Sequence, residues 1–350
     1  MFGESHGTAI GGIADSFPAG EKIDMQALAS FCARRRPGQK LATPRKESDL
    51  PEILSGMRDE VTTGTPLAIS IRNTDCRSAD YGNCAAVPRP GHADLSAILR
   101  YGEASDRRGG GHFSGRLTAP LTVLGGIALQ ILAKRGIRIG AHLASAAGVE
   151  DEKFDPVDPA KELLAPGQKE FPVICDRCGE KMQEAIRKIA VAGDSCGGVV
   201  ECAVTGFPAG VGSPMFDGIE NRLAGAIFGI PAVKGLEFGS GFAGSAQCGS
   251  VNNDPFVCSD GTIRTATNNA GGILGGISSG MPVIFKVAFK PTPSISIPQQ
   301  SVDVKSMTPA ELTVQGRHDP CVAIRAVPVV EAVAALVMLD LLMSEKRQEI

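Results

Sequence analysis

The chain contains no tryptophan, only two tyrosines among its 350 residues, and no long run of lysine or arginine. Its formal net charge at pH 7 is −3. Proteins that bind nucleic acid usually combine a positively charged surface with aromatic side chains on which bases stack. These absences therefore argue against a nucleic-acid-binding function.

Histidine is also scarce, with five residues in the whole chain, and four of these stand beside glycine, arginine or aspartate. The four segments are Gly-Glu-Ser-His6-Gly, Arg-Pro-Gly-His92-Ala-Asp, Gly-Gly-Gly-His112-Phe-Ser-Gly-Arg and Gly-Arg-His318-Asp-Pro-Cys, whereas His142 lies in ordinary apolar sequence. Glycine lets the backbone approach a ligand closely, and histidine titrates near neutral pH. We predict that the histidines of these segments serve chemistry.

The ten cysteines indicate a reducing compartment, because no signal peptide is recognisable, and we expect a cytoplasmic protein. Cys175 and Cys178 form a single C-x-x-C pair, but a zinc ribbon needs a second pair and the sequence has none. We therefore predict a structural role for these two residues and no metal site.

Two stretches, 117–133 and 326–342, approach the apolarity of membrane spans. The first is shorter than the ~20 residues that a span needs and contains Pro120. The second contains Glu331 and Asp340. We interpret both as helices that are apolar nearly all round and therefore buried on several sides.

Arginines gather in Gly/Pro-rich segments and not on amphipathic helix faces: Arg34, Arg35, Arg36, Arg45, Arg89, Arg107, Arg108, Arg116 and Arg317. They could be solvated surface residues. Guanidinium groups, however, match the planar geometry of carboxylate and phosphate, so we favour a pocket that binds such anions.

Two parts of the chain resemble each other in order. Segments 11–20 and 198–210 each end in Phe-Pro-Ala-Gly, and helical patterns follow over 25–36 and 216–228. Alternating strands are predicted over 67–72 and 283–289, and an apolar helix follows Pro120 and Pro328. Chance similarity of Gly/Pro turns is the alternative to our hypothesis of a duplicated domain with a pseudo-twofold axis.

Strands with one polar face, together with helices that have none, indicate sheets packed outside helices. We predict an α+β fold with central helices layered between antiparallel sheets. The chain then forms one domain, 1–350, whose possible halves are 1–149 and 190–345. A polar excursion over about 150–189, with a helical run ending near Ile189, separates them.

Eight motifs occur in the order in which they are found in chorismate synthases, over nearly the whole chain. They are GESHG (3–7), RPGHADL (89–95), GGGHFSGRLTA (109–119), GDSCGGVVE (193–201), IPAVKGLEFGSGF (230–242), NNAGGILGGISSGMP (268–282), KPTPSI (290–295) and RHDPCVAIRAVPVVEA (317–332). The chain therefore resembles that family.

The resemblance implies the anti-1,4-elimination of phosphate from 5-enolpyruvylshikimate 3-phosphate to give chorismate, in the shikimate pathway of aromatic amino acid biosynthesis. It further implies a lyase that needs reduced FMN with no net redox change, a β-α-β sandwich and a homotetramer. Some members of the family reduce their own flavin with NADPH, and the sequence leaves this open.

Residue by residue, His6 matches the family histidine thought to protonate reduced flavin, His92 the one near the leaving phosphate, and Asp319 the acid thought to relay a proton. The positions that correspond to substrate binding are Ser5, Arg36, Arg45, Arg89, Arg116 and Arg317. Those that correspond to flavin binding are Ser114, Gly115, Asn269, Ala270, Gly275, Lys290, Ser294 and Arg317. Ser5 could instead cap its turn, and for His112 we favour a structural role.

Two alternatives stay open. The family usually has a further short strand upstream of GESHG, so we expect His6 beside a mobile, charged amino terminus. A non-catalytic protein that binds flavin or a phosphorylated ligand is then possible. A flavin oxidoreductase of the dinucleotide type would need Gly-x-Gly-x-x-Gly between a strand and a helix, which the glycine runs at 109–111 and 271–276 do not fit.

Overall fold

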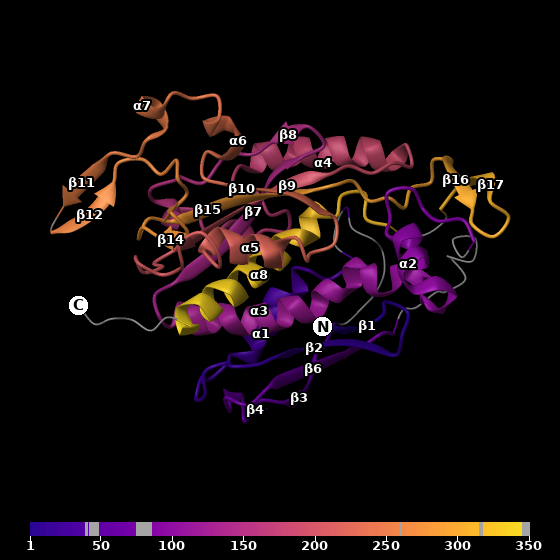
Figure 1. The fold of residues 1–350 in the computed structure, drawn as a ribbon, viewed down its shortest axis with the longest axis horizontal. Coiled ribbons are helices and arrows are strands. Elements are labelled where there is room, and N and C mark those ends of the chain that lie inside the picture. The colour runs from indigo at the N-terminus through magenta and orange to yellow at the C-terminus, as the bar shows by residue number, and fades with distance from the viewer. Residues whose placement is uncertain (39–40, 42–48, 75–85, 260, 315–317, 345–350) are drawn as a thin grey trace.

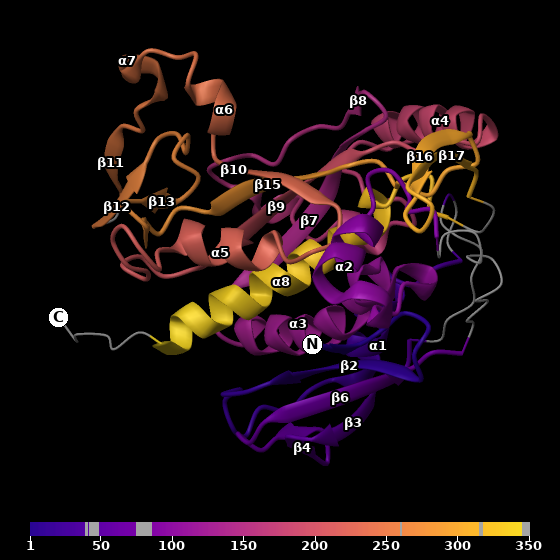
Figure 2. The same ribbon diagram turned by 45° about the vertical axis from the view of Figure 1, so that its right-hand side comes forward.

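Two antiparallel sheets enclose a layer of helices, as the ribbon views show (Figure 1, Figure 2). The computed structural model describes the chain except residues 39–40, 42–48, 75–85, 260, 315–317 and 345–350. A structural neighbour with the same architecture is reported below. The prediction of helices between antiparallel sheets is confirmed.

The first sheet has the strand order β1-β2-β6-β3 and is antiparallel throughout. Its strands are β1 (Phe2–Gly3), β2 (Ala9–Ala14), β6 (Leu67–Arg72) and β3 (Glu52–Ser55). Leu67, Ile69 and Ile71 alternate along β6 and are all buried. This two-residue period directs one face of the sheet at the helices.

The second sheet has the order β10-β15-β9-β7-β8. Its strands are β10 (Val233–Phe238), β15 (Val283–Phe289), β9 (Gly198–Thr205), β7 (Arg138–Ala146) and β8 (Val149–Glu150). A separate cluster of Phe154, Leu163, Ala203 and Ile284 packs residues of the 150–175 segment against this sheet. The sheet is therefore buried on both faces, and the polar excursion covers part of it.

The helical layer consists of α1 (Met25–Ala33), α3 (Thr118–Ala133), α5 (Ile219–Ile227) and α8 (Ala323–Ser344). Segments Gly115–Ala133 and Ala323–Ser344 are long and apolar enough to cross a membrane, but 78% of each apolar window is buried inside the fold. Within α8, the carboxylate of Glu331 accepts hydrogen bonds from Arg34 (2.6 and 2.9 Å) and from the Ala141 N–H (2.9 Å). Both helices are thus core helices, as predicted.

The remaining elements are shorter or lie at the periphery. They are β4 (Met57–Arg58), β5 (Val61–Thr62), α2 (Asp94–Tyr101), α4 (Asp176–Val191), α6 (Gly241–Gly244), α7 (Gly249–Asn252), β11 (Phe256–Ser259), β12 (Thr262–Thr265), β13 (Ile273–Leu274), β14 (Ile277–Ser278), β16 (Gln299–Asp303) and β17 (Thr308–Leu312). Short 3₁₀ turns span Gly102–Ala104, Arg108–Phe113, Gly115–Leu117, Pro159–Lys161 and Pro166–Gln168.

The strands predicted over 67–72 and 283–289 are confirmed with those bounds, whereas three helix boundaries differ. The helix predicted over 25–36 ends at Ala33. The one predicted from 216 begins at Ile219, because Asp217 has a φ of 61° and Gly218 a ψ of 171°. Helix α8 begins at Ala323 and carries Pro328 inside it, which removes one helical N–H donor.

Each half contains a strand, a helix, a strand and a core helix in the same order. In the first half these are β2, α1, β6 and α3, and in the second they are β9, α5, β15 and α8. This order agrees with the duplication hypothesis. The pseudo-twofold axis and the limits of the halves stay predictions until the halves are superposed.

Candidate active site

A cavity of about 710 Å³ lies between loops of the two halves. It is lined by residues from the end of α1, the 109–121 segment, the 228–234 segment, the end of β15 and the start of α8. Among the described lining residues, six are lysine or arginine and one is a carboxylate: Arg35, Arg89, Arg116, Lys234, Lys290 and Arg325 against Asp319. A cleft of this composition concentrates anions.

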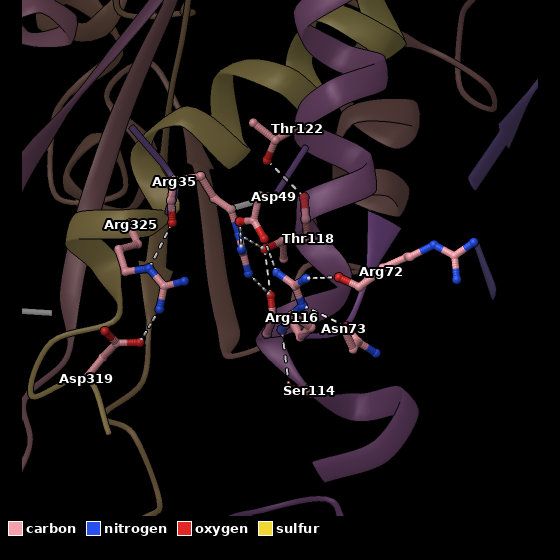
Figure 3. A network of polar contacts seen from close by, with 11 residues as sticks. Arg35, Asp49, Arg72, Asn73, Ser114, Arg116, Thr118, Thr122, Asp319 and Arg325 are labelled. Atoms are coloured by element: carbon pink, nitrogen blue, oxygen red, sulfur yellow. Dashed lines mark hydrogen bonds and ion pairs between the residues drawn. The ribbon is translucent and has the colours of Figure 1, made fainter. Parts of the chain in front are cut away.

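One wall of the cavity is built around Asp49, which holds two arginines (Figure 3). Arg35 Nη1 lies 2.8 Å from Asp49 Oδ2, and Arg116 Nη1 contacts Asp49 Oδ1. Arg35 Nε also donates to the Thr118 hydroxyl at 3.1 Å, and Arg116 Nε to Asn73 Oδ1 at 3.1 Å. Burial raises the pKa of Asp49, but the two guanidinium groups outweigh it and hold that pKa below its usual range. Because two guanidinium groups face one carboxylate, the cluster keeps a net positive charge.

A second wall is organised by Asp94, the first residue of α2. Arg89 Nε and Nη2 form a two-pronged ion pair with its carboxylate at 2.7 and 2.8 Å, and Arg89 Nη1 donates to Ser294 Oγ at 3.2 Å. His92 Nδ1 lies 2.7 Å from Asp94 Oδ1. Burial opposes ionisation, yet hydrogen bonds from Arg89 and His92 bring the pKa of Asp94 well below its usual range.

The glycine triplet 109–111 lies in space between His6 and His92. All three glycines have positive φ, of 62°, 103° and 55°. A Cβ on Gly109 would lie 2.4 Å from His6 Nε2, and one on Gly110 would lie 3.2 Å from His92 Nε2. Glycine is therefore required here for two reasons, the backbone conformation and the close approach of both imidazoles.

The GESHG segment is held against this triplet. The Ser5 N–H donates to the Gly111 carbonyl at 3.1 Å, and the Ser5 hydroxyl donates to the Arg108 carbonyl at 3.1 Å. His6 is 8% exposed. The expected position beside a loose terminus is thus not what the structure shows, because hydrogen bonds and burial fix the motif.

Asp319 and Arg325 form the third polar group of the cavity (Figure 3). Arg325 Nη1 lies 2.6 Å from Asp319 Oδ2, and its Nε donates to the Arg35 carbonyl at 2.9 Å. Both side chains are largely buried, with exposed fractions of 13% and 12%. One arginine on α8 thus orients the carboxylate and ties it to the end of α1.

The structure brings most of the predicted site residues together. Those that line the cavity are His92, Asp319, Arg89, Arg116, Ser114, Gly115, Lys290 and Ser294. His6 and Ser5 lie next to the lining residue Gly109, and Arg36 stands in the chain between the lining residues Arg35 and Pro37. Arg45 and Arg317 lie outside the described residues.

Asn269, Ala270 and Gly275 are not among the described residues that line the cavity. The N–H groups of Asn269 and Ala270 donate instead to Asp254, at 2.7 and 2.9 Å. Gly275 belongs to the turn between β13 and β14. A flavin-binding role of these three positions stays a prediction.

No role is predicted from the sequence for Asp49, Asp94 or Arg325, and Arg35 is predicted only as one of the arginines of an anion-binding pocket. Asp94 carried a signal, since it stands two residues after His92 in the same motif, and Arg35 lies in a noticed run of arginines. Asp49 is separated from its partners by 14 and 67 residues, so nothing local in the sequence indicated the cluster.

His142 lies outside the cavity in a fully buried group of its own. Its Nδ1 is 3.0 Å from Asp151 Oδ2 and its Nε2 is 2.9 Å from Glu201 Oε2. Burial lowers its pKa, but the two carboxylates raise it further, so that the pKa of His142 lies above its ordinary value. The apolar sequence around His142 gives no sign of these two partners.

The cavity fits a planar apolar ring with an anionic tail. Its volume falls within the ~300–1,000 Å³ of small-molecule sites. One part of the lining is apolar, formed by Leu117, Leu121, Phe228, Ile230, Val233, Phe289, Val322 and Val329. Gly115 faces open space, since a Cβ there would meet nothing within 4 Å. The lysines and arginines of the same lining suit phosphate.

Comparisons with known proteins agree on one family. A family model described as chorismate synthase matches residues 1–343. A protein named chorismate synthase from Lancefieldella parvula is 44% identical to this chain, over 98% of the chain and 94% of its own length. One from Archaeoglobus fulgidus is 45% identical, over 98% of the chain and 94% of its own length. One from Thermococcus gammatolerans is 43% identical, over 100% of the chain and 96% of its own length. A solved structure titled as a crystal structure of chorismate synthase aligns with a TM-score of 0.75 at 27% identity, over 98% of this chain and 90% of that one.

Proposed function

The chain belongs to the chorismate synthase family, and on that premise we propose how its cavity forms chorismate from 5-enolpyruvylshikimate 3-phosphate. The function is chorismate formation in the shikimate pathway of aromatic amino acid biosynthesis. A non-catalytic binding protein is not favoured, since relatives over the whole length carry the name of the enzyme.

The observation that carries the proposal is the excess of positive charge in the cavity. The substrate has one phosphate and two carboxylates, and among the described lining residues six cations stand against a single carboxylate. Asp49 and Asp94 behind the wall neutralise this charge only in part and hold the guanidinium groups in place. Arginines fixed in this way bind planar anions without a further cost of ordering their long side chains.

His92 is proposed as the proton donor to the departing phosphate. With its Nδ1 hydrogen-bonded to Asp94 at 2.7 Å, its Nε2 is the ring nitrogen directed at Gly110. The contact with Asp94 fixes the orientation of the imidazole, as positioned general-acid catalysis requires. Arg89 shares the same carboxylate and adds positive charge where the leaving group would gather negative charge.

Asp319 is proposed as the acid that would relay a proton from the ring of the cofactor. Its ion pair with Arg325 fixes its orientation. His6, packed against Gly109 on the other side of the triplet, is proposed to hold a proton next to the cofactor.

We propose reduced FMN as the cofactor, held by Ser114, Gly115, Lys290 and Ser294 beside the apolar wall. When bound, it supplies an electron transiently, so that the reaction has no net redox change. The Lys290 ammonium already contacts the Gly91 carbonyl, and burial together with the Lys234 charge lowers its pKa. An anion beside Lys290 relieves this repulsion.

Several finer features of the family are proposed for this chain as well. The reaction is that of a carbon–oxygen lyase acting on phosphates, in the cytoplasm and in a homotetramer. Asn269, Ala270 and Gly275 would contact flavin from a second copy of the chain, because they do not line this cavity. Whether the flavin is reduced by NADPH on the protein is tested by supplying NADPH in place of a chemical reductant.

Anaerobic turnover of 5-enolpyruvylshikimate 3-phosphate tests the proposal. Phosphate release and chorismate absorbance are followed with chemically reduced FMN and, in parallel, with oxidised FMN. We expect both products with reduced flavin only. Absence of product from a folded chain that binds reduced FMN and substrate would contradict the proposal and favour a binding protein.

A further inference from the structure

Three potential metal ligands converge outside the catalytic cavity, at the start of α4. The Sγ atoms of Cys175 and Cys178 and a carboxylate oxygen of Asp151 all lie within 4.8 Å of one another. Asp151 follows β8 directly, and Cys175 is the residue before α4. The cluster therefore joins the edge of the second sheet to the amino end of a helix.

The carboxylate of Asp151 is held in a fixed orientation. Its Oδ2 accepts the Ile174 N–H at 2.6 Å and faces His142 Nδ1 at 3.0 Å, while its Oδ1 accepts the Cys175 N–H at 3.0 Å. A carboxylate has about four acceptor positions, and these three contacts leave one for a cation. The same N–H contacts bring the backbone before α4 onto Asp151, so both thiols approach it.

His142 supports the cluster from inside the protein. One ring nitrogen faces Asp151 and the other lies 2.9 Å from Glu201 Oε2, with Lys286 Nζ 4.0 Å from the same carboxylate. Carboxylates that ligate metals are oriented by hydrogen bonds from such a surrounding shell of polar groups. Asp151, His142 and Glu201 thus form a buried chain of polar contacts that holds the Asp151 carboxylate in place beside the two thiols.

We propose that Asp151, Cys175 and Cys178 bind one thiophilic divalent cation, for which Zn²⁺ is the probe, with water as the fourth ligand. Two sulfur ligands select Zn²⁺ over Mg²⁺ or Ca²⁺, and the carboxylate completes a tetrahedral set. Neither cysteine lines the catalytic cavity, so the site is distinct from that of chorismate formation. The cation would clamp β8 to α4.

Binding must displace the protons of the two thiols, because thiolate is the form that coordinates zinc. No electron is transferred, and the sulfur atoms stay reduced. A disulfide between the same two cysteines would instead need an oxidant, and it would remove both ligands.

The test is calorimetric titration of Zn²⁺ into the reduced full-length chain without a histidine tag, in two buffers of different ionisation enthalpy. We expect one ion per chain and the release of up to about two protons. Cys175→Ser and Cys178→Ser should each weaken binding by more than about 100-fold. The exposed Cys248, replaced as Cys248→Ser, is the matched control and should bind like the native chain.

Cobalt gives an independent readout of the ligand set. Reduced chain loaded with Co²⁺ should show thiolate-to-cobalt absorption in the near ultraviolet and the intense visible bands of a tetrahedral ion, both absent from Cys178→Ser. The proposal is overturned if native chain binds Zn²⁺ no better than Cys175→Ser, if both variants bind like the native chain, or if Co²⁺ shows no thiolate band. Circular dichroism of the variants establishes that they are folded.

Discussion

His92 and His142 each place Nδ1 against a buried aspartate, at 2.7 and 3.0 Å, yet their surroundings differ at the other nitrogen. Nε2 of His142 faces Glu201, and the side chain is fully buried. Nε2 of His92 is directed at Gly110 of the glycine triplet, and the His92 side chain lines the cavity and is 15% exposed. We therefore propose that the same histidine–aspartate pair serves chemistry at His92, which lines the cavity, and holds the fold at His142, where both ring nitrogens are covered.

The largest expected effect is the loss of catalysis on substitution of His92. His92→Ala should lower the rate of phosphate release by roughly 10²–10⁴-fold, because the proton donor to the leaving group is lost. Its thermal midpoint should stay close to that of the native chain. Anaerobic phosphate release and thermal unfolding check both statements, and an unchanged rate would remove His92 from the mechanism.

The matched substitution in the core should act on stability. His142→Asn leaves Asp151 and Glu201 buried without the cation between them, which costs about 3–5 kcal/mol in the free energy of unfolding. The rate per folded molecule should change little, because His142 is not among the described lining residues. Urea unfolding measures the loss. A rate that falls as steeply as in His92→Ala would break the comparison.

The same contrast is expected between two arginines, Arg325 of α8 at the cavity and Arg222 of α5 away from it. Arg325→Ala removes a charged hydrogen bond to Asp319 worth about 1.5–3 kcal/mol and should lower turnover by about 10- to 100-fold. Arg222, which pairs with Asp340 at the other end of α8, is the control. Arg222→Ala should leave turnover within about twofold, since surface pairs contribute little. Equal effects of the two substitutions would contradict the role of Arg325.

The smallest expected effect is a dependence on pH. The pKa of His142 is raised above its ordinary 6.5, so its contribution to stability is fully present below that value and is lost as pH rises through the folded-state pKa. The pKa of Asp151 is lowered from 3.8, so its contribution is lost as pH falls through the folded-state pKa. The stability difference between native chain and His142→Asn should therefore shrink as the pH rises above about 6.5. A constant or growing difference in urea unfolding would contradict this sign.

The layers of the fold could be predicted because they follow from local pattern. Alternating residues gave strands 67–72 and 283–289, and helices apolar on every face had to lie inside. Helix ends were harder. The backbone before Ile219 leaves helical geometry at Asp217 and Gly218, which the apolar pattern of that segment does not reveal.

The candidate site was predicted in part. His92 and Asp319 were found through their motifs, and the structure places both on the cavity wall. Arg325 has a local partner, since Asp319 stands six residues before it in the same motif, but no role was predicted for it. Asp49 was missed because its partners, such as Arg116, come from distant parts of the chain. His142 was missed for the same reason, since Glu201 is 59 residues away on the neighbouring strand.

Nitrogen-15 spectra of the five imidazole rings, assigned with His92→Asn and His142→Asn, test most directly whether His92 presents Nε2 to the substrate. They are recorded before and after addition of 5-enolpyruvylshikimate 3-phosphate with oxidised FMN, under which no turnover is expected. The account predicts that the Nε2 resonance of His92 moves and that both resonances of His142 stay in place. An unchanged Nε2 resonance of His92, in a chain shown by titration to bind the substrate, would contradict the account.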